Sequence, residues 1–188
     1  MKTKSNKQGN KKNKKWENYK WTLKLMLLAF AISITFSFIS EIALKNASLL
    51  VSTIIVLIFI LIGVLFDMVG MSVATAEEAP FHSMSARKIK SAKVAVMLKR
   101  NADKVSSFCN DVIGDICGIV SGSAGVVIAS SISSMFHISL LLCSLVTTAV
   151  IAALTIGGKA FEKTIAMEKS NEILYQFSRI IGFFYIGK

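Results

Sequence analysis

Six oxygen-bearing residues lie at the ends of two apolar runs, where they could bind a cation. Asp67 ends the second apolar run, and Asn110, Asp111 and Asp115 open the third. Asp111 and Asp115 are four residues apart, a spacing that places both on one face of an α-helix. Hard divalent cations such as Mg²⁺ prefer carboxylate and neutral oxygen ligands. We therefore predict a Mg²⁺ site made by six residues: Asp67, Ser72, Ser107, Asn110, Asp111 and Asp115.

A second interpretation of these acids needs no ion. They would lie at the level of the lipid headgroups and pair with three nearby cations, Lys99, Arg100 and Lys104. Spacing alone does not separate the two interpretations. Other chemistry has little support, because the three cysteines lack metal-ligand spacing and there is no nucleophile–base set, phosphate loop or cofactor fingerprint. We expect no enzyme activity.

The elements that position these residues are predicted to be membrane-spanning helices. The chain has 188 residues, 53% of them hydrophobic, and a net charge of +11. Residues 25–40, 46–66 and 116–158 carry no charge, and about 20 such residues cross a bilayer as a helix. The third run is long enough for two helices, with a break expected at the serines of 130–134. The sequence thus predicts an all-α membrane protein of about four spans, at residues 21–45, 46–69, 112–132 and 136–158.

Basic residues indicate the orientation of these spans. Residues 1–20 carry eight lysines against one acid, and the loop between the second and third spans carries seven Lys or Arg. The segment after Gly158 carries five, whereas the opposite side carries only Lys45. By the positive-inside rule, both termini are cytoplasmic. We expect the tail, residues 1–20, to be disordered and to touch anionic headgroups of the plasma membrane, and we expect no nucleic-acid binding.

Helices are predicted in the basic loop, at about 80–110. Another helix is predicted after the last span, at about 160–186. Ser85 is a candidate cap for a helix over 85–100, with a cationic face and an apolar face, as in helices that lie on a membrane surface. Pro80 would separate it from the second span. A further helix begins near Asp103 and continues into the third span. There, Gly114, Gly118 and Gly122 make a ridge for close helix packing, either within the chain or between two copies.

Two stretches resemble the transmembrane domain of the CNNM/CorB/CorC family. One is Lys90-Ser-Ala-Lys-Val-Ala-Val-Met-Leu followed by Asn101-Ala-Asp-Lys-Val-Ser-Ser107, and the other is Gly158-Lys-Ala-Phe-Glu-Lys-Thr-Ile-Ala166. The resemblance covers residues 48–186 and leaves 21–45 as an added helix. It implies transport of Mg²⁺ or Co²⁺, usually by dimers, through a cavity that faces the cytoplasm. We expect a stand-alone form of this domain, without the CBS domains typical of that family.

The resemblance also implies differences at the ion site. The first-span motif of the family falls near Val69-Gly-Met-Ser72, where Gly70 and Ser72 match. The glutamate expected in the last span is Lys159 here, and the following proline is Glu162. The chain is then either a minimal transporter with a rearranged site or a non-transporting scaffold or regulatory subunit. We expect Lys159 to pair with the acids in a scaffold and to point away from them in a transporter.

Overall fold

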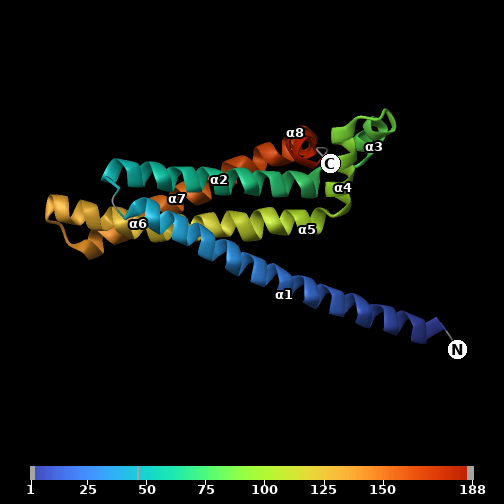
Figure 1. Cartoon of the computed structure of the whole chain (residues 1–188), viewed down its shortest axis with the longest axis horizontal. Helices are drawn as coiled ribbons and strands as arrows, with labels where there is room; N and C mark the ends of the chain where they lie inside the picture. The colour runs from blue at the N-terminus through green and yellow to red at the C-terminus, as the bar shows by residue number, and fades with distance from the viewer. Residues whose placement is uncertain (1–2, 46, 186–188) are drawn as a thin grey trace.

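The structure, a computed structural model, describes residues 3–45 and 47–185, and all its regular elements in these ranges are helices (Figure 1). Four helical stretches are long and apolar enough to cross a membrane, as predicted: Tyr19–Leu44, Leu49–Thr75, Ala102–Phe136 and Leu140–Glu168. The chain is therefore an all-α membrane protein. The spans belong to α1 (Thr3–Leu44), α2 (Leu49–Thr75), the continuous α5 (Ala102–Ser107), η1 (Phe108–Gly114) and α6 (Asp115–Phe136), and α7 (Leu140–Glu168).

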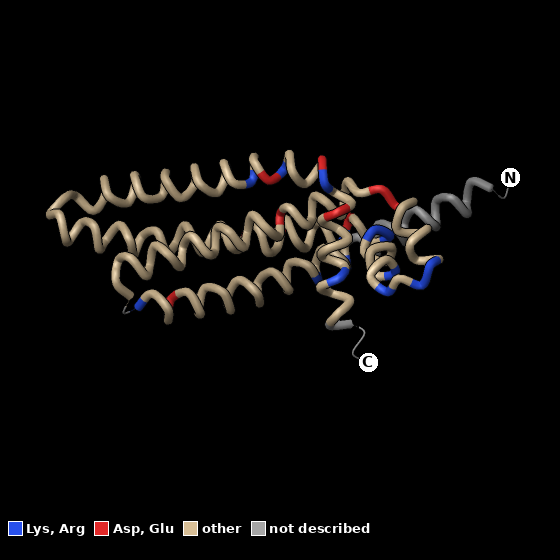
Figure 2. Tube along the Cα trace, turned by 90° about the horizontal axis from the view of Figure 1, so that it is seen from above, with Lys and Arg blue, Asp and Glu red and all other residues tan. Residues whose placement is uncertain are grey.

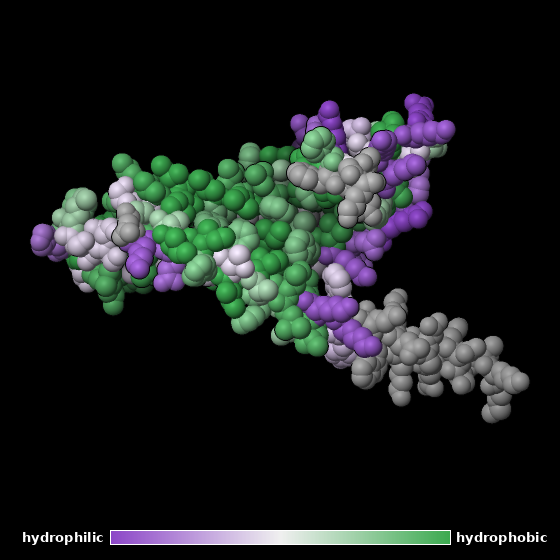
Figure 3. Space-filling view, in the orientation of Figure 1, coloured by the Kyte–Doolittle hydropathy of each residue, from purple (hydrophilic) through white to green (hydrophobic). Residues whose placement is uncertain are grey.

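The charges divide the bundle into two ends. Most Lys and Arg residues gather at one end, which we call the basic end, whereas the other half of the bundle carries almost no charge (Figure 2). An apolar band separates the two ends on the molecular surface (Figure 3). Helices are the structures that satisfy every backbone hydrogen bond within one segment, so apolar runs of this length adopt them in lipid.

The helix of the first span extends toward the N-terminus, and the disorder expected for residues 1–20 stays a prediction. α1 begins at Thr3 and continues without a break into the first span; residues 1 and 2 lie outside the described residues. Lysine is a good helix former, and extending an existing helix avoids the cost of nucleating a new one.

The turn between the last two spans was also misplaced. It lies at residues 137–139, not at the serines of 130–134, which remain inside α6. Ser131 and Ser134 donate to carbonyl oxygens one turn earlier, so their hydroxyl groups are satisfied within the helix. His137 adopts a left-handed conformation, φ 54°, and ends α6.

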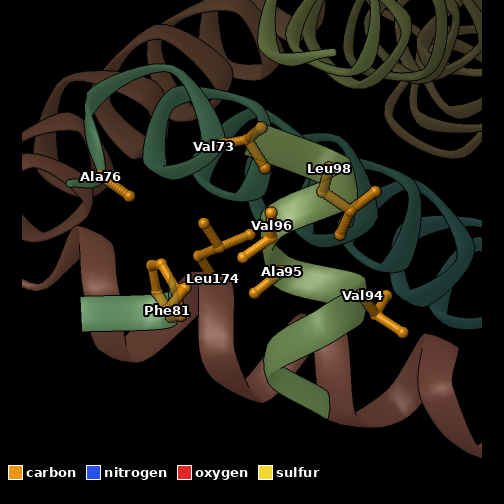
Figure 4. Close-up of a cluster of buried hydrophobic side chains, with 8 residues drawn as sticks. All are labelled: Val73, Ala76, Phe81, Val94, Ala95, Val96, Leu98 and Leu174. Atoms are coloured by element: carbon orange, nitrogen blue, oxygen red, sulfur yellow. The ribbon is translucent and has the colours of Figure 1, made fainter. Parts of the chain in front are cut away.

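A small apolar core covers the basic end. It is formed by the last turns of α2 together with α3 (Ala79–Ala86), α4 (Lys90–Arg100) and α8 (Ser170–Tyr185), and we call these last three helices the cap (Figure 4). Phe81 and Leu174 are fully buried there. The apolar face of α4 therefore packs against protein, so the prediction that it lies on the membrane surface was wrong.

Two further boundaries in the cap differ from the prediction. The helix expected over 85–100 is broken at residues 87–89, where Lys88 has a φ of 63° and turns the chain between α3 and α4. The helix expected over 160–186 is divided as well, because α7 continues to Glu168 and α8 begins at Ser170. Lys99 fixes the cap to the second span by donating to the carbonyl oxygens of Val73 (3.2 Å) and Ala74 (2.8 Å), which lack partners within the helix.

Candidate functional site

Charged residues from three spans meet at one depth in the bundle. Asp67, Asp115 and Lys159 lie 18 to 21 residues from the ends of α2, α6 and α7 that are remote from the basic end. At about 1.5 Å per residue this is roughly 27–32 Å, close to the thickness of the hydrocarbon core. The three side chains therefore lie where the apolar part of the bundle meets the basic end.

Lys159 is at the centre of this group. Its Nζ lies 3.1 Å from Asp67 Oδ2 and 3.5 Å from Asp115 Oδ1. The Asp67 side chain is 14% exposed, Lys159 is 30% exposed and Asp115 is 65% exposed. Lys159 thus bridges a mostly buried carboxylate and an accessible one. It also lies over Gly114, where an added Cβ would be 3.6 Å from its Nζ.

Asn110 holds Asp67 from a second side. In the amide orientation that its neighbours support, Asn110 Nδ2 donates to the backbone oxygen of Asp67 (3.1 Å) and to its Oδ1 (3.3 Å). This approach requires a glycine at position 70. A Cβ there would lie 1.8 Å from a terminal atom of the Asn110 amide and 3.0 Å from the Cβ of Cys109. Gly70 therefore gives Asn110 the room to reach Asp67.

A π-helix explains which polar residues of the third span share this site. Residues 108–114 form the seven-residue η1, in which backbone hydrogen bonds join residues five apart. Asn110 and Asp115, five residues apart, thereby come to the same side of the helix, and both reach the Asp67–Lys159 pair. Asp111 is exposed and makes no hydrogen bond or ion pair with the described residues. Asp111 therefore lies outside the group of side chains that contact Asp67 and Lys159.

Glu162 is a site residue that the sequence analysis did not include. It lies one turn after Lys159 on α7 and is 5% exposed, and both Asp67 and Lys159 act on it electrostatically. Its Oε2 is the buried side-chain atom that has no hydrogen-bond partner among the described residues. The spacing of three residues from Lys159 was visible in the sequence, but it was interpreted only as a replaced family proline. We call Asp67, Asn110, Asp115, Lys159 and Glu162 the Lys159 cluster.

The remaining predicted ligands lie outside this cluster. Ser72 is fully buried between α2 and α7 and donates to the carbonyl oxygens of Met68 (2.8 Å) and Ala166 (3.4 Å), so its hydroxyl serves helix packing. Ser107 is half-buried and makes no side-chain hydrogen bond with the described part of the chain. The structure thus brings together three of the six predicted residues: Asp67, Asn110 and Asp115.

The alternative pairing of these acids with Lys99, Arg100 and Lys104 does not occur. Lys99 caps α2, the Arg100 Nε lies 3.7 Å from Glu78, and the Lys104 Nζ lies over the Trp21 ring at 5.1 Å from its centre. These cations are engaged at the basic end. The acids pair with Lys159 instead, a residue of a third span.

The charges of the cluster do not balance. Asp67, Asp115 and Glu162 can carry three negative charges, and the Lys159 ammonium supplies one positive charge. Within the described residues, no group of three or more His, Cys, Asp or Glu is arranged to hold a metal ion. The cluster is therefore a set of ion pairs with more acidic than basic groups. It is not a preformed metal-binding site. Removing or moving the ammonium would leave the carboxylates of Asp67 and Asp115 without the positive group that they share.

Comparison with known proteins adds no relative: no family model matches the chain, and no curated protein matches it.

Proposed function

We propose that this chain is a membrane transporter for a divalent cation, with Mg²⁺ as the first candidate and Co²⁺ as the second. The observation that supports it most is the unequal charge of the Lys159 cluster. Two aspartates from two spans contact a single ammonium group, and the Asn110 amide and the Glu162 carboxyl group lie beside them. Ionisable groups at membrane depth are costly, and they usually mark an ion pathway.

Lys159 occupies the place that the cation would take. Its Nζ contacts both Asp67 and Asp115, so the ion must displace it before it can bind them. The Lys159 side chain is 30% exposed and flexible, so it can turn toward the basic end when its partners are taken. The ion would then meet carboxylate oxygens of Asp67 and Asp115, with Asn110 and Glu162 beside them. Mg²⁺ commonly keeps several waters and uses one or two carboxylates, so a closed protein cage is not required.

Further parts of the proposal follow from the charge pattern and from the family resemblance. The protein would lie in the plasma membrane. Its basic end and both termini would face the cytoplasm. The basic N-terminal residues would lie near anionic headgroups. The resemblance to the CNNM/CorB/CorC domain implies a homodimer. Gly118 and Gly122 are consistent with a homodimer. A Cβ added at either would meet no atom of another described helix within 4 Å, so both positions are open to a helix of a second copy.

The test is calorimetric titration of Mg²⁺ into the full chain in detergent. We expect saturable binding by the wild type, loss of binding in Asp67→Asn, and tighter binding in Lys159→Met, which lacks the competing ammonium. Glu168→Gln is the matched control, because Glu168 is an exposed acid of the same helix outside the cluster. Binding that follows this pattern would be pursued by Mg²⁺ flux into vesicles that contain the protein.

A scaffold or regulatory subunit is the second candidate function, and the Lys159 ion pairs favour it. Lys159 pairing with the acids was the arrangement expected of a scaffold, in which the ammonium closes the site. That expectation considered the aspartates alone; Glu162 adds a third, buried carboxyl group beside them, which makes transport our first proposal. Absence of Mg²⁺ binding in both the wild type and Lys159→Met would reject transport and leave the scaffold.

A further inference from the structure

A second polar site lies in the half of the bundle remote from the Lys159 cluster. A cavity of about 590 Å³ separates the end of α1 from the middle of α6. Its lining includes three serines and two charged residues together with apolar side chains: Ser37, Ser40, Glu41, Lys45, Ser123 and Val127. A cavity of this volume is large enough for a small molecule or a lipid headgroup.

Two exposed charged side chains line this cavity. In the described ranges 25–45, 47–66 and 116–158, Glu41 and Lys45 are the charged residues. They lie one helical turn apart, yet their side chains form no ion pair with each other or with any described residue. A carboxylate and an ammonium that line one cavity and do not pair are complementary to a ligand that carries both signs.

We propose that this cavity binds the headgroup of phosphatidylethanolamine in the leaflet opposite the basic end. Lys45 would donate to the lipid phosphate, and Glu41 would accept from the lipid ammonium. The phosphate and ammonium of this headgroup are joined by two carbon atoms, and side chains four apart on a helix have Cβ atoms about 5–6 Å from each other, which suits one small headgroup. The acyl chains would lie along the apolar surfaces of α1 and α6 that face lipid.

The serines of the cavity add selectivity for a primary amine. Ser40 is 4% exposed, and the hydroxyl of Ser123 donates to the Val120 carbonyl oxygen at 2.9 Å, which leaves its lone pairs as acceptors. A primary ammonium offers three N–H donors to Glu41 and to such hydroxyls, whereas the quaternary ammonium of phosphatidylcholine offers none. Phosphatidylglycerol has no positive group for Glu41 at all.

Native mass spectrometry of the full chain in detergent, titrated separately with these three phospholipids, tests the proposal. The wild type should hold one phosphatidylethanolamine about threefold to tenfold more tightly than either other lipid, the range for one partly exposed charge-assisted hydrogen bond. Glu41→Gln should abolish that preference, and Lys45→Gln should weaken all three lipids. Glu77→Gln and Lys90→Gln are the controls, because both residues are exposed at the basic end.

Val127→Phe provides a test that leaves the charges unchanged. The larger ring fills part of the cavity and should lower the bound fraction of phosphatidylethanolamine while the helical circular dichroism stays the same. Equal affinity of the wild type for the three lipids, or a preference that survives in Glu41→Gln, would overturn the proposal. Neither result depends on whether Mg²⁺ binds at the Lys159 cluster.

Discussion

The membrane bundle and the cap distribute the same residue types in opposite ways. In the bundle, Phe38 of α1 points outward and is 63% exposed, while the charged Lys159 cluster lies between the spans. In the cap, Phe81 is 2% exposed, whereas Lys90 and Lys93 are exposed. The difference reflects the surroundings of each region. Lipid accepts apolar side chains and excludes unpaired charge, whereas water drives apolar side chains inward.

The largest contrast is expected from one substitution made in both regions. Phe81→Ala should destabilise the cap by about 3–5 kcal/mol, because it leaves a cavity in a small apolar core. Phe38→Ala should cost less than about 1 kcal/mol, because lipid fills the space. Hydrogen exchange of the α3, α4 and α8 amides in nanodiscs measures the effect. Similar protection in the two variants would contradict the assignment of Phe81 to a water-facing core.

Loss of the central ammonium should have the next largest effect. Lys159→Met leaves Asp67 without its ion pair, and we expect a loss of about 1–3 kcal/mol, less than for a fully buried pair because Lys159 is partly exposed. Thermal unfolding followed by circular dichroism measures it, with the exposed Lys163→Met as control. Millimolar Mg²⁺ should restore stability in Lys159→Met if the ion takes the place of the ammonium. Equal melting of the two variants would show that the pair carries little stability.

A smaller effect is expected from the contact of Gly70 with Asn110. Gly70→Ala forces the Asn110 amide away from Asp67, so the hydrogen bonds between them are lost at about 1 kcal/mol each. Asn110→Ala loses the same bonds. The double variant should therefore be no less stable than the worse single variant, and Mg²⁺ affinity should follow the same pattern. Additive losses in this cycle would mean that Gly70 acts on the fold by another route.

The smallest effect is expected at the surface of the cap. Glu78 Oε1 lies 3.7 Å from Arg100 Nε, and both side chains are exposed. Such pairs contribute about 0.2–1 kcal/mol and are screened by salt. Arg100→Gln should shift the midpoint of thermal unfolding only slightly, and not at all in high salt. A large shift would place this pair in a network that the cap depends on.

The four spans could be predicted because each depends on one property that the sequence displays directly. An uninterrupted apolar run of about 20 residues has few alternatives to a helix in lipid, so residues 46–66 and 116–158 gave the fold class. Turns were harder to place. Ser131 and Ser134 resemble turn residues, but their hydroxyls can bond to the helix backbone, and only the conformation of His137 ends α6.

The site was predicted in part. Asp67, Asn110 and Asp115 were named from their chemistry and their place at the ends of apolar runs. Asp111 was named on the same grounds, but its exposed side chain makes no hydrogen bond or ion pair with the described residues. The burial of Glu162 and its closeness to Asp67 depend on how α7 packs against α2. A single sequence does not display that contact.

The π-helix makes the site depend on backbone conformation as well as on residue type. If η1 wound as an ordinary α-helix with the same residues, all four apolar spans would remain. Asn110 and Asp115 would then lie about 140° apart around the helix, and the two could no longer face the same partner. Hydropathy and charge would not change. Substitutions that replace the π-helix by an α-helix would therefore separate descendants that keep the site from those that keep the fold alone.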